Sequence, residues 1–524
     1  MAVVTIARNA VVAQLRDPPR EVKNFVASLL SYKEEGGLGF SGTASFFSIT
    51  RNTFPAGFAY TVKAELERIG HTVYEVFKPH AAPLGPENPI VDEFGNDDPR
   101  YDYQMKALRQ VEKHGAGIIR VATGGGKSKI AKLIMSRFKR MTLFLTTRGI
   151  LLYQMDDQLQ EIGFNTGQIG DGEMKFVRGV NLGMVQTLVQ ALEVPDLAAE
   201  RRAVVKSAHQ RKNGNSEIGE AEIARLAQER FDKKTKRRAA IVKFLELVEV
   251  VIGEEAHEAG GTSYYEILRH CKNATIRVAL TATPFMKDSA ADNMRLMAAF
   301  GPVLIDIPES LLIERGILAK PYFVFRDCEA PKGLHKSSPF ERAYTLAYVR
   351  DTSPLHKVML EDAMMAKRYG LPTLTLVART EAGDNLMALY KRFGLRVVFL
   401  RGDDDQKERK ARLADLAAGR IDVVIGTKIL DVGVDCPAIG LVQLGGGMKA
   451  EVELRQRIGR GLRYKKVGPN VTFIADYSIN LNGTLRDHAR RREGIVRATP
   501  GFVEGILPAN DNFPWGIFER KAAA

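Results

Sequence analysis

The sequence predicts an α/β fold of two tandem parallel-sheet domains, with a small α+β module before them. Short apolar runs alternate with helical stretches along two long parts of the chain, which is the pattern of parallel strands connected by helices. A glycine-rich loop at 123–128 joins one such run to a helical stretch. The length of 524 residues exceeds what one hydrophobic core supports, so more than one domain is expected.

The composition favours a polyanionic partner. The chain is 45% hydrophobic and 26% charged, as globular proteins are, and its formal net charge is +14 with a pI near 9.5. This excess of positive charge favours nucleic acid as the partner, although a basic protein without such a partner has the same balance. No apolar run approaches the ~18–20 residues that a membrane span needs, so we expect no membrane partner.

The cysteines and the first residues indicate a cytoplasmic protein. Cys271, Cys328 and Cys436 form neither a disulfide framework nor a zinc-binding spacing, so we expect a reducing compartment and cysteines that serve as small core residues. Met1–Leu15 is apolar but broken by Arg8 and Asn9, so it predicts a strand and not a signal peptide.

Residues 1–92 are expected to form the first part, an α+β module. Strand-like and helical patterns alternate in it, and Gly70 stands where a helix C-cap is expected. Pro79–Asp98 is rich in Pro, Asn and Asp and predicts a linker. The predicted strands are Val3–Ile6, Ala44–Thr50 and His71–Phe77. One predicted helix opens at Pro18–Glu21 and continues to Leu30, and a second runs from about Gly57 to Ile69.

Residues 93–318 are expected to form the first parallel-sheet domain. One segment, 197–247, interrupts the strand order, is helical in pattern and is very basic, so we expect an inserted helical arm. Its cations are either a solvated face or contacts to phosphate. The predicted strands are Gly117–Arg120, Met141–Thr146, Asn181–Met184, Glu249–Gly253 and Arg277–Leu280.

Residues 319–478 are expected to form the second domain, and 479–524 a helical tail. The tail contains a basic helix, Leu485–Val496, and the only tryptophan, Trp515, which we expect to be a docking contact. The predicted strands of the second domain are Tyr322–Phe325, Thr373–Val377, Arg396–Phe399, Asp422–Ile425, Leu441–Leu444 and Val471–Ala475.

The loop Val121–Ser128 has the residues of a phosphate-binding loop. Glycines let backbone N–H groups turn toward a phosphate, and the following helix N-terminus adds partial positive charge. Lys127 can reach the β- and γ-phosphates, and the hydroxyl of Ser128 suits Mg²⁺. The alternative is a glycine-rich turn before an ordinary helix.

Two further segments carry candidate catalytic groups. Glu254 and Glu255 directly follow an apolar run, where ligands bind in open parallel sheets, so one carboxylate can hold Mg²⁺ and the other can polarise water. Arg460 and Arg463, three apart, can lie on one helical face and reach a γ-phosphate. The alternative for the arginines is a basic surface helix.

The ordered set of motifs resembles the superfamily 2 helicases and translocases, which have two RecA-like domains. The resemblance covers about 100–476. The matching segments are Tyr101–Gln104, Val121–Ser128, Phe144–Arg148, Gly183–Leu188, Glu254–His257, Thr281–Thr283, Gly426–Asp435 and Gln456–Arg463. Two positions depart from the family pattern, because Glu254 stands in place of Asp and Val432 in place of an acid. We expect hydrolysis to survive Glu254, since displacing a water makes room for the longer side chain.

The resemblance implies that ATP and Mg²⁺ bind between the two RecA-like domains. It implies a catalytic set of Glu255, Lys127, Arg460, Arg463 and Gln456, and Mg²⁺ held by Ser128 and Glu254. The implied nucleotide contacts are Gln104, Thr123, Gly124, Gly125, Gly126, Lys127, Ser128, Gly433 and Asp435. The implied nucleic-acid contacts are Thr147, Arg148, Gln186, Thr187 and Thr427.

The first module narrows the resemblance. Arg51–Phe58, an amphipathic helix and Gly70–Val73 resemble the N-terminal domain of phage UvsW-type branch-migration helicases. This implies a DNA-binding accessory module and an enzyme of recombination and repair that unwinds or branch-migrates forks, junctions or R-loops, in a bacterial or phage-infected cytoplasm. The alternatives are an RNA helicase, a translocating subunit of a restriction or defence complex, and a DNA-binding scaffold with a decayed ATPase.

Overall fold

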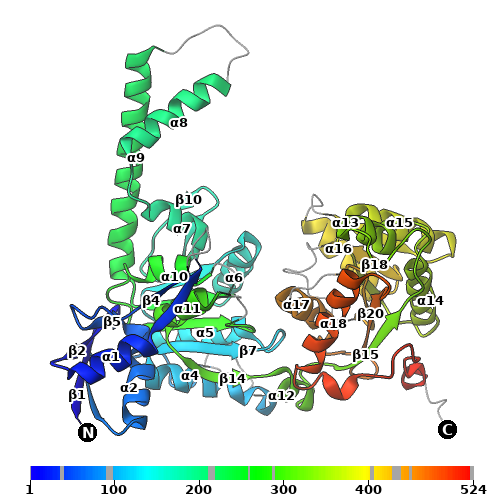
Figure 1. The fold of residues 1–524 in the computed structure, drawn as a ribbon, viewed down its shortest axis with the longest axis horizontal. Helices are drawn as coiled ribbons and strands as arrows, with labels where there is room; N and C mark the ends of the chain where they lie inside the picture. The colour runs from blue at the N-terminus through cyan, green and yellow to red at the C-terminus, as the bar shows by residue number, and fades with distance from the viewer. Residues whose placement is uncertain are drawn as a thin grey trace. The chain divides into compact units, whose positions relative to one another are not determined.

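The computed structural model describes residues 2–35, 41–89, 98–210, 219–257, 260–285, 289–401, 406–427, 438–447 and 451–519. The chain divides into two compact units (Figure 1). The first comprises Met1–Arg120 and Lys127–Asp306, and the second comprises Val121–Gly126 and Ile307–Ala524. Within the described residues, no helix is long and apolar enough to cross a membrane.

The N-terminal module is a four-stranded sheet covered by two helices. Val4 and Ile6 of its central strand are fully buried, because alternate residues of a strand face the same side. The first two strands form an antiparallel hairpin, and β6 pairs parallel to β1. The sheet order is β5-β2-β1-β6. The elements are β1 (Val3–Arg8), β2 (Val12–Arg16), α1 (Arg20–Leu29), β5 (Thr53–Pro55), α2 (Ala59–Arg68) and β6 (Thr72–Phe77).

The predicted strand at 44–50 is wrong over most of its length. The strand is β4 (Ser41–Ser45), which pairs with β3 (Ser31–Glu35) in a separate hairpin. The chain turns after Ser45 because Phe47 is buried in the core of the module, with its ring near that of Phe54.

The module packs on the first sheet domain through α11 (Ala290–Phe300). Ala298 belongs to the core of the module, and Tyr265, Met294 and Met297 pack against it. The approach is close, because a Cβ added to Gly57 would lie 2.2 Å from the carbonyl oxygen of Met297. A glycine is therefore required at this contact, and the module packs directly against the domain without a gap for a side chain.

The sheet of the first domain has eight strands, in the order β10-β9-β11-β8-β12-β13-β7-β14. All five predicted strands are present, and β9, β10 and β14 were not predicted. β10 is antiparallel to β9, whereas the strands from β9 to β7 run parallel. The strands are β7 (Ala116–Val121), β8 (Thr142–Thr146), β9 (Thr166–Gly170), β10 (Glu173–Met174), β11 (Val180–Met184), β12 (Val250–Glu254), β13 (Ile276–Thr281) and β14 (Val303–Ile307).

Helices connect these strands and complete the core. Apolar residues of α7, α9, α10 and α11 pack with those of β7, β8, β12 and β13 in one cluster. The helices are α4 (Asp102–His114), α5 (Lys127–Phe138), α6 (Gly149–Glu161), α7 (Val185–Leu192) and α10 (Gly260–Leu268).

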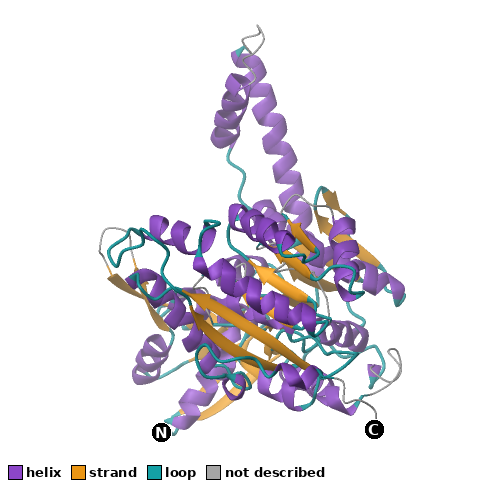
Figure 2. Cartoon of the chain, turned by 90° about the vertical axis from the view of Figure 1, so that its right-hand side faces the viewer, coloured by secondary structure: helices purple, strands orange, loops and turns teal. Residues whose placement is uncertain are grey.

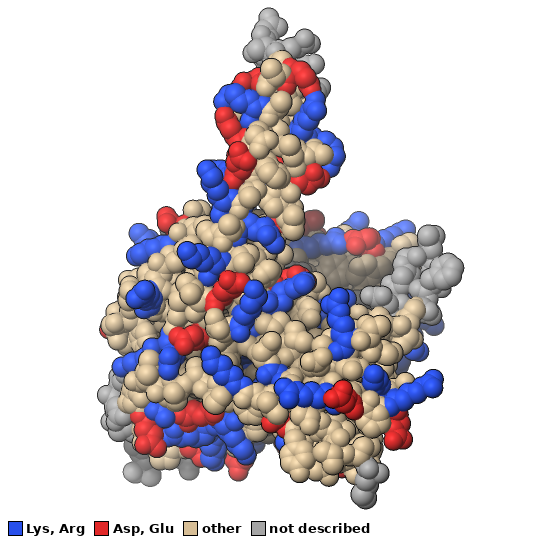
Figure 3. Space-filling model, turned by 90° about the vertical axis from the view of Figure 1, so that its left-hand side faces the viewer, with Lys and Arg blue, Asp and Glu red and all other residues tan. Residues whose placement is uncertain are grey.

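The predicted helical arm consists of α8 (Leu197–Gln210) and α9 (Glu220–Leu247). It stands out from the sheet domain in both ribbon views (Figures 1 and 2). The end of α9 belongs to the core, because Ile241, Phe244 and Leu245 are buried there. On the exposed part both charge signs alternate (Figure 3), and several arginines are paired, as Arg225 is with Glu222.

The second unit contains a six-stranded parallel sheet in the order β15-β20-β19-β16-β18-β17. All six predicted strands are present. The strands are β15 (Lys320–Asp327), β16 (Thr373–Leu376), β17 (Val397–Leu400), β18 (Val423–Gly426), β19 (Leu441–Leu444) and β20 (Val471–Ser478). The helices are α12 (Glu309–Glu314), α13 (Phe340–Tyr344), α14 (Pro354–Arg368), α15 (Thr380–Arg392), α16 (Gln406–Ala417), α17 (Glu451–Gly461) and α18 (Gly483–Arg497).

The tail closes the core of the second unit. Trp515 stacks on Tyr369 at 5.6 Å and meets the edge of Phe473 at 5.0 Å, so the predicted docking contact is confirmed. Cys271 and Cys328 are buried, and burial raises the pKa of each thiol to about 12, which confirms them as inert core residues. Cys436 lies outside the described residues.

Candidate functional site

The glycine-rich loop lies between the end of β7 and the start of α5. Gly124 and Gly126 have φ angles of 91° and 84°, a left-handed backbone that favours glycine. A Cβ on Gly125 would lie 2.6 Å from Cγ1 of Val121. Backbone conformation at Gly124 and Gly126, and lack of space at Gly125, therefore favour glycine at all three positions. The glycines form a tight turn at the N-terminus of α5, where anions are stabilised.

Lys127 of this loop forms an ion pair with Glu255, the second carboxylate of the acidic motif Glu254–His257. Lys127 Nζ lies 2.9 Å from Glu255 Oε1, and the two side chains are only 10% and 18% exposed. Glu254 is the last residue of β12, and Glu255 follows it with a φ angle of 44°. Such a backbone is rare for a side-chain-bearing residue, and strained conformations of this kind concentrate at functional sites.

Nearby positive charge keeps Glu255 ionised. Burial alone would raise the pKa of Glu255, but Lys127, then His257, and also Arg148 outweigh it and lower the pKa. Glu255 is therefore a carboxylate at neutral pH. Arg148, predicted as a nucleic-acid contact, is close enough to the acidic motif to contribute to this charge balance.

His257 connects the acidic motif to the threonine motif, Thr281–Thr283. Its Nδ1 lies 3.4 Å from Glu255 Oε2 and 2.7 Å from Thr281 Oγ1. Thr281 Oγ1 also accepts a hydrogen bond from the backbone N–H of Thr283, at 3.2 Å. A continuous polar path thus runs from Lys127 through Glu255 to the end of β13.

Two buried oxygens at this site lack a hydrogen-bond donor among the described residues. They are Glu255 Oε2 and Thr283 Oγ1. Buried polar atoms normally have a partner, so these two fit a bound polar ligand or its waters. Glycine loop, lysine, carboxylate and unsatisfied oxygens together suit a nucleotide phosphate.

The residues predicted for Mg²⁺ are Ser128 and Glu254. Glu254 is buried, and its carbonyl oxygen accepts a hydrogen bond from Tyr264 Oη at 3.1 Å. Among the described residues there is no group of three or more His, Cys, Asp or Glu side chains that could hold a metal. A hydroxyl and a carboxylate fit Mg²⁺, which keeps several waters and binds substrate phosphates.

Four of the predicted nucleic-acid contacts gather at one edge of the first sheet. Thr147 and Arg148 follow β8, and Gln186 and Thr187 begin α7 directly after β11. β8 and β11 are parallel neighbours in which Thr146 pairs with Met184, so their carboxyl ends lie side by side. The fifth, Thr427, follows β18 in the second unit and is 9% exposed.

Other predicted contacts are placed less directly. Gln104 lies on α4 and is almost fully buried, and Thr123 is partly exposed in the loop. Gly433 and Asp435 lie outside the described residues.

The expectation that Arg460 and Arg463 share a helical face is wrong. Gln456 and Arg460 lie on α17, but the helix ends at Gly461, and Arg463 forms a β-bridge with Leu318. The helix ends there because the carbonyl oxygen of Gly461 accepts hydrogen bonds from Thr472 Oγ1 at 2.6 Å and from Lys465 Nζ at 2.7 Å.

Some residues of the site had no individual role assigned from the sequence. His257 and Thr281 belong to segments that match the family pattern, and this is the feature of the sequence that could have identified them as site residues. Arg457, between the predicted arginines, is 3% exposed. No pattern in the sequence indicates Tyr264 as a site residue, because the packing of α10 beside β12 is what brings it to Glu254.

Comparison with protein families gives two matches. Residues 98–286 match the family described as "Type III restriction enzyme, res subunit", and residues 356–465 match "Helicase conserved C-terminal domain". The first match contains the glycine loop and the acidic motif, and the second contains Gln456, Arg460 and Arg463.

Similar proteins occur among curated sequences. "Putative helicase 22" of a Sulfolobus islandicus filamentous virus is 26% identical over 283 residues, 51% of this chain and 50% of that protein. "UvrABC system protein B" of Chloroflexus aggregans is 32% identical over 147 residues, 27% of this chain and 21% of that protein. The chain thus spans half or less of the length of these relatives.

Two solved structures match this chain, and the first of them is similar in fold. The helicase MrfA bound to DNA has a TM-score of 0.52 at 14% identity, with 80% of this chain and 52% of that chain covered. UvsW of bacteriophage T4 has a TM-score of 0.42 at 15% identity, with 96% and 98% covered.

Proposed function

This chain is a helicase of superfamily 2, and on that premise we propose that it hydrolyses ATP to unwind or branch-migrate DNA at forks, junctions or R-loops. The observation that carries the ATPase is the ion pair of Lys127 and Glu255 behind the glycine loop, with buried oxygens nearby that accept no hydrogen bond from any described residue. The excess of positive charge supports a nucleic-acid partner.

In this proposal, Lys127 exchanges its partner when ATP binds. Its ammonium group leaves Glu255 for the β- and γ-phosphates, while the glycine loop and the N-terminus of α5 bind the phosphates. Glu255 then loses the largest of the charges that lower its pKa, so it becomes a stronger base toward the attacking water. Lys127 thereby couples nucleotide binding to the basicity of the catalytic carboxylate.

Ser128 and Glu254 would hold Mg²⁺, and Gln104 and Thr123 would contact the nucleotide. The metal, when bound, neutralises charge on the phosphate oxygens. By the family resemblance, Arg460 and Arg463 stabilise the charge that develops on the γ-phosphate, and Gln456 orients the attacking water, with Gly433 and Asp435 on the nucleotide.

The DNA contacts are proposed to be sequence-independent. Thr147, Arg148, Gln186, Thr187 and Thr427 would contact phosphate and sugar, which carry no sequence information. Residues 1–92 would act as a DNA-binding accessory module beside the domains at 93–318 and 319–478, with the tail at 479–524. We place this activity in recombination or repair, in the cytoplasm of a bacterial or phage-infected cell.

The test is ATP turnover with no nucleic acid, single-stranded DNA, duplex DNA, a model fork and single-stranded RNA, with Lys127→Ala as the control. We expect the fork to stimulate turnover most and the variant to be inactive. Stimulation by RNA alone would replace this proposal with an RNA helicase. Absence of turnover with every substrate would contradict an autonomous ATPase and favour the decayed scaffold.

A second candidate is the translocating subunit of a restriction complex. The match of 98–286 to the res subunit of type III restriction enzymes favours it. It requires a nuclease partner, so stable co-purification of a nuclease from the native host, and DNA cleavage by the assembly, would support it over the first.

A further inference from the structure

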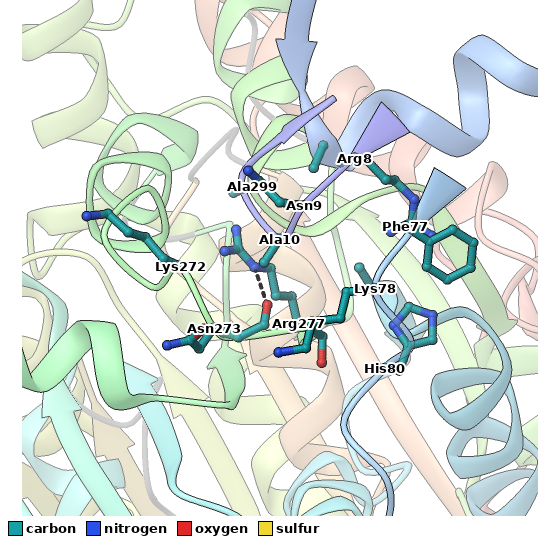
Figure 4. A pocket seen from close by; sticks show the side chains of 15 residues that line it. Arg8, Asn9, Ala10, Phe77, Lys78, His80, Lys272, Asn273, Arg277 and Ala299 are labelled. Carbon is teal, nitrogen blue, oxygen red and sulfur yellow. Dashed lines mark hydrogen bonds between the residues drawn. The ribbon is translucent and has the colours of Figure 1, made fainter. Parts of the chain in front are cut away.

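A small pocket lies where the N-terminal module meets the first sheet domain (Figure 4). The module contributes the turn after β1 and the end of β6, and the domain contributes the amino ends of β7 and β13 with the turn before β13. Its volume is about 90 Å³. All of these elements belong to the same compact unit.

The pocket is lined by positive charge. Its charged lining residues are Arg8, Lys78, Lys272 and Arg277, and among the described lining residues none is acidic. His80 also lines it, but burial lowers the pKa of this imidazole, so it adds no charge at neutral pH. Two of the cations are partly satisfied, since Lys272 Nζ bonds Glu246 at 2.6 Å and Arg8 Nε lies 3.5 Å from Glu75. Lys78 is exposed and forms no ion pair with any described residue.

Arg277 is the cation that most needs an anion. It is only 5% exposed, its Nε donates to the carbonyl oxygen of Ala274 at 2.8 Å, and its Nη2 donates to that of Cys271 at 2.7 Å. Its Nη1 donates to no described residue, and no described carboxylate lies within ion-pair distance. Burial without a carboxylate lowers the pKa of Arg277 to about 10.

A buried guanidinium without an opposite charge is costly, because carbonyl dipoles replace only part of its hydration. An anion in the pocket would offset this cost and would meet the Nη1 side of Arg277. The pocket volume of about 90 Å³ is several times the ~10–15 Å³ that one water needs, so a tetrahedral oxyanion has room in it.

We propose that this pocket is a second phosphate-binding site, in which Arg277, Lys78 and Arg8 bind the phosphate oxygens. It is distinct from the glycine loop, because β7 runs from Ala116 at the pocket to Val121 at the loop, on opposite edges of the sheet. The phosphate is either a backbone phosphodiester of DNA or free inorganic phosphate. Binding needs no ATP turnover.

The first experiment measures inorganic phosphate binding by calorimetry in a Lys127→Ala background, at constant ionic strength. We expect Lys78→Gln to weaken binding about tenfold and Arg277→Gln to abolish it. Lys33→Gln is the matched control, since Lys33 is exposed on the same module away from the pocket. Lys78 is exposed, so its variant keeps its fold even if Arg277→Gln does not.

Equal phosphate affinity in the Lys78→Gln and Lys33→Gln proteins would overturn the proposal. Because the Lys127→Ala background is expected to lack turnover, this result is independent of the proposed helicase function. A second arm identifies the source of the phosphate. If it is DNA, Lys78→Gln reduces the salt slope of DNA affinity by about 1, and Lys33→Gln does not. If the variant no longer binds phosphate and the slope is unchanged, the ligand is the free anion.

Discussion

At the scale of single residues, Glu255 combines three unusual properties. It has a left-handed backbone, a largely buried carboxylate and an ion pair to the lysine of the glycine loop. The backbone strain is maintained by the surrounding structure, with β12 before it and His257 after it. These features make Glu255 the group whose replacement should separate nucleotide binding from turnover.

We predict that Glu255→Gln lowers ATP turnover by about 10²–10⁴-fold, the usual effect of losing a general base. The amide keeps the shape but cannot accept a proton, and it no longer competes for Lys127 as a charge, so ATP should bind at least as tightly as it does to the unchanged protein. Turnover assays and nucleotide titration measure the two effects. Glu266→Gln, on the exposed side of α10, is the control and should be active. A fully active Glu255→Gln protein would refute the assignment.

The lowered pKa of Glu255 sets the expected pH dependence. The pKa of Glu255 is lower in the folded protein than in the unfolded chain, so the folded carboxyl is ionised at every pH above the unfolded pKa. It becomes protonated only when the pH falls through the lowered folded pKa. We therefore expect no loss of kcat/KM, which reports the ATP-free protein, from Glu255 protonation above about pH 4.3, the reference pKa of glutamate. The acid limb of kcat should lie at higher pH, because Lys127 has left the carboxylate in the ATP complex.

His257 tests the same charge balance, because it is the second of the groups that lower the pKa of Glu255. His257→Asn should move the acid limb of the pH–turnover profile to higher pH. An acid limb that stays in place in this variant would mean that another group controls it.

At the scale of elements, the arm is the candidate for long-range contacts to phosphate. Many of its arginines are paired, but Lys233, Lys236 and Arg237 are exposed and form no ion pair with any described residue. They lie before the turns of α9 that enter the core, so their replacement leaves the fold intact.

We predict that changing Lys233, Lys236 and Arg237 together to glutamine weakens DNA binding and reduces its salt slope by up to about 3, one for each phosphate that the variant no longer binds. ATP turnover without DNA should be unchanged. A variant with Lys113, Lys332 and Lys391 changed to glutamine has the same net charge and serves as the control. Equal slopes for the two variants would show that the arm is only a solvated face.

The tail is a second element with a defined role. Phe513 stacks on Phe473 at 4.7 Å and lies under the guanidinium of Arg326 at 5.7 Å. We predict that Phe513→Ala lowers the free energy of unfolding of the second unit by about 3–5 kcal/mol through the cavity it leaves. Urea titration followed by Trp515 fluorescence measures this. Ile517→Ala, at an exposed position of the same segment, should change it by about 0.5 kcal/mol or less.

At the scale of the whole molecule, the chain has two compact units, and its only tryptophan lies in the second. Trp515 fluorescence therefore reports one unit, whereas far-UV circular dichroism reports both. We predict that urea unfolding curves from the two probes differ in midpoint, because contacts concentrate within each unit. Coincident curves would show a single cooperative transition.

Much of the fold was predictable because the buried strands of both sheets are apolar runs that stand out locally. β9 and β10 were not, because β9 contains two glycines and β10 has only two residues. The strand at 44–50 was misplaced because the aromatic residues after Ser45 look like part of an apolar strand in the sequence. In the structure the chain turns there, and Phe47 is buried in the core of the module.

Local order along the chain is enough to place the glycine loop, the acidic pair and the two alternating domains, since each depends on residues that are neighbours in sequence. The pairing of Lys127 with Glu255, the path through His257 to Thr281 and the uncompensated charge of Arg277 depend on strand order. Parallel strands bring together residues that are far apart in the chain, and burial then decides which charges find a partner. Only the tertiary structure decides these contacts, because they arise from packing and not from any spacing in the sequence.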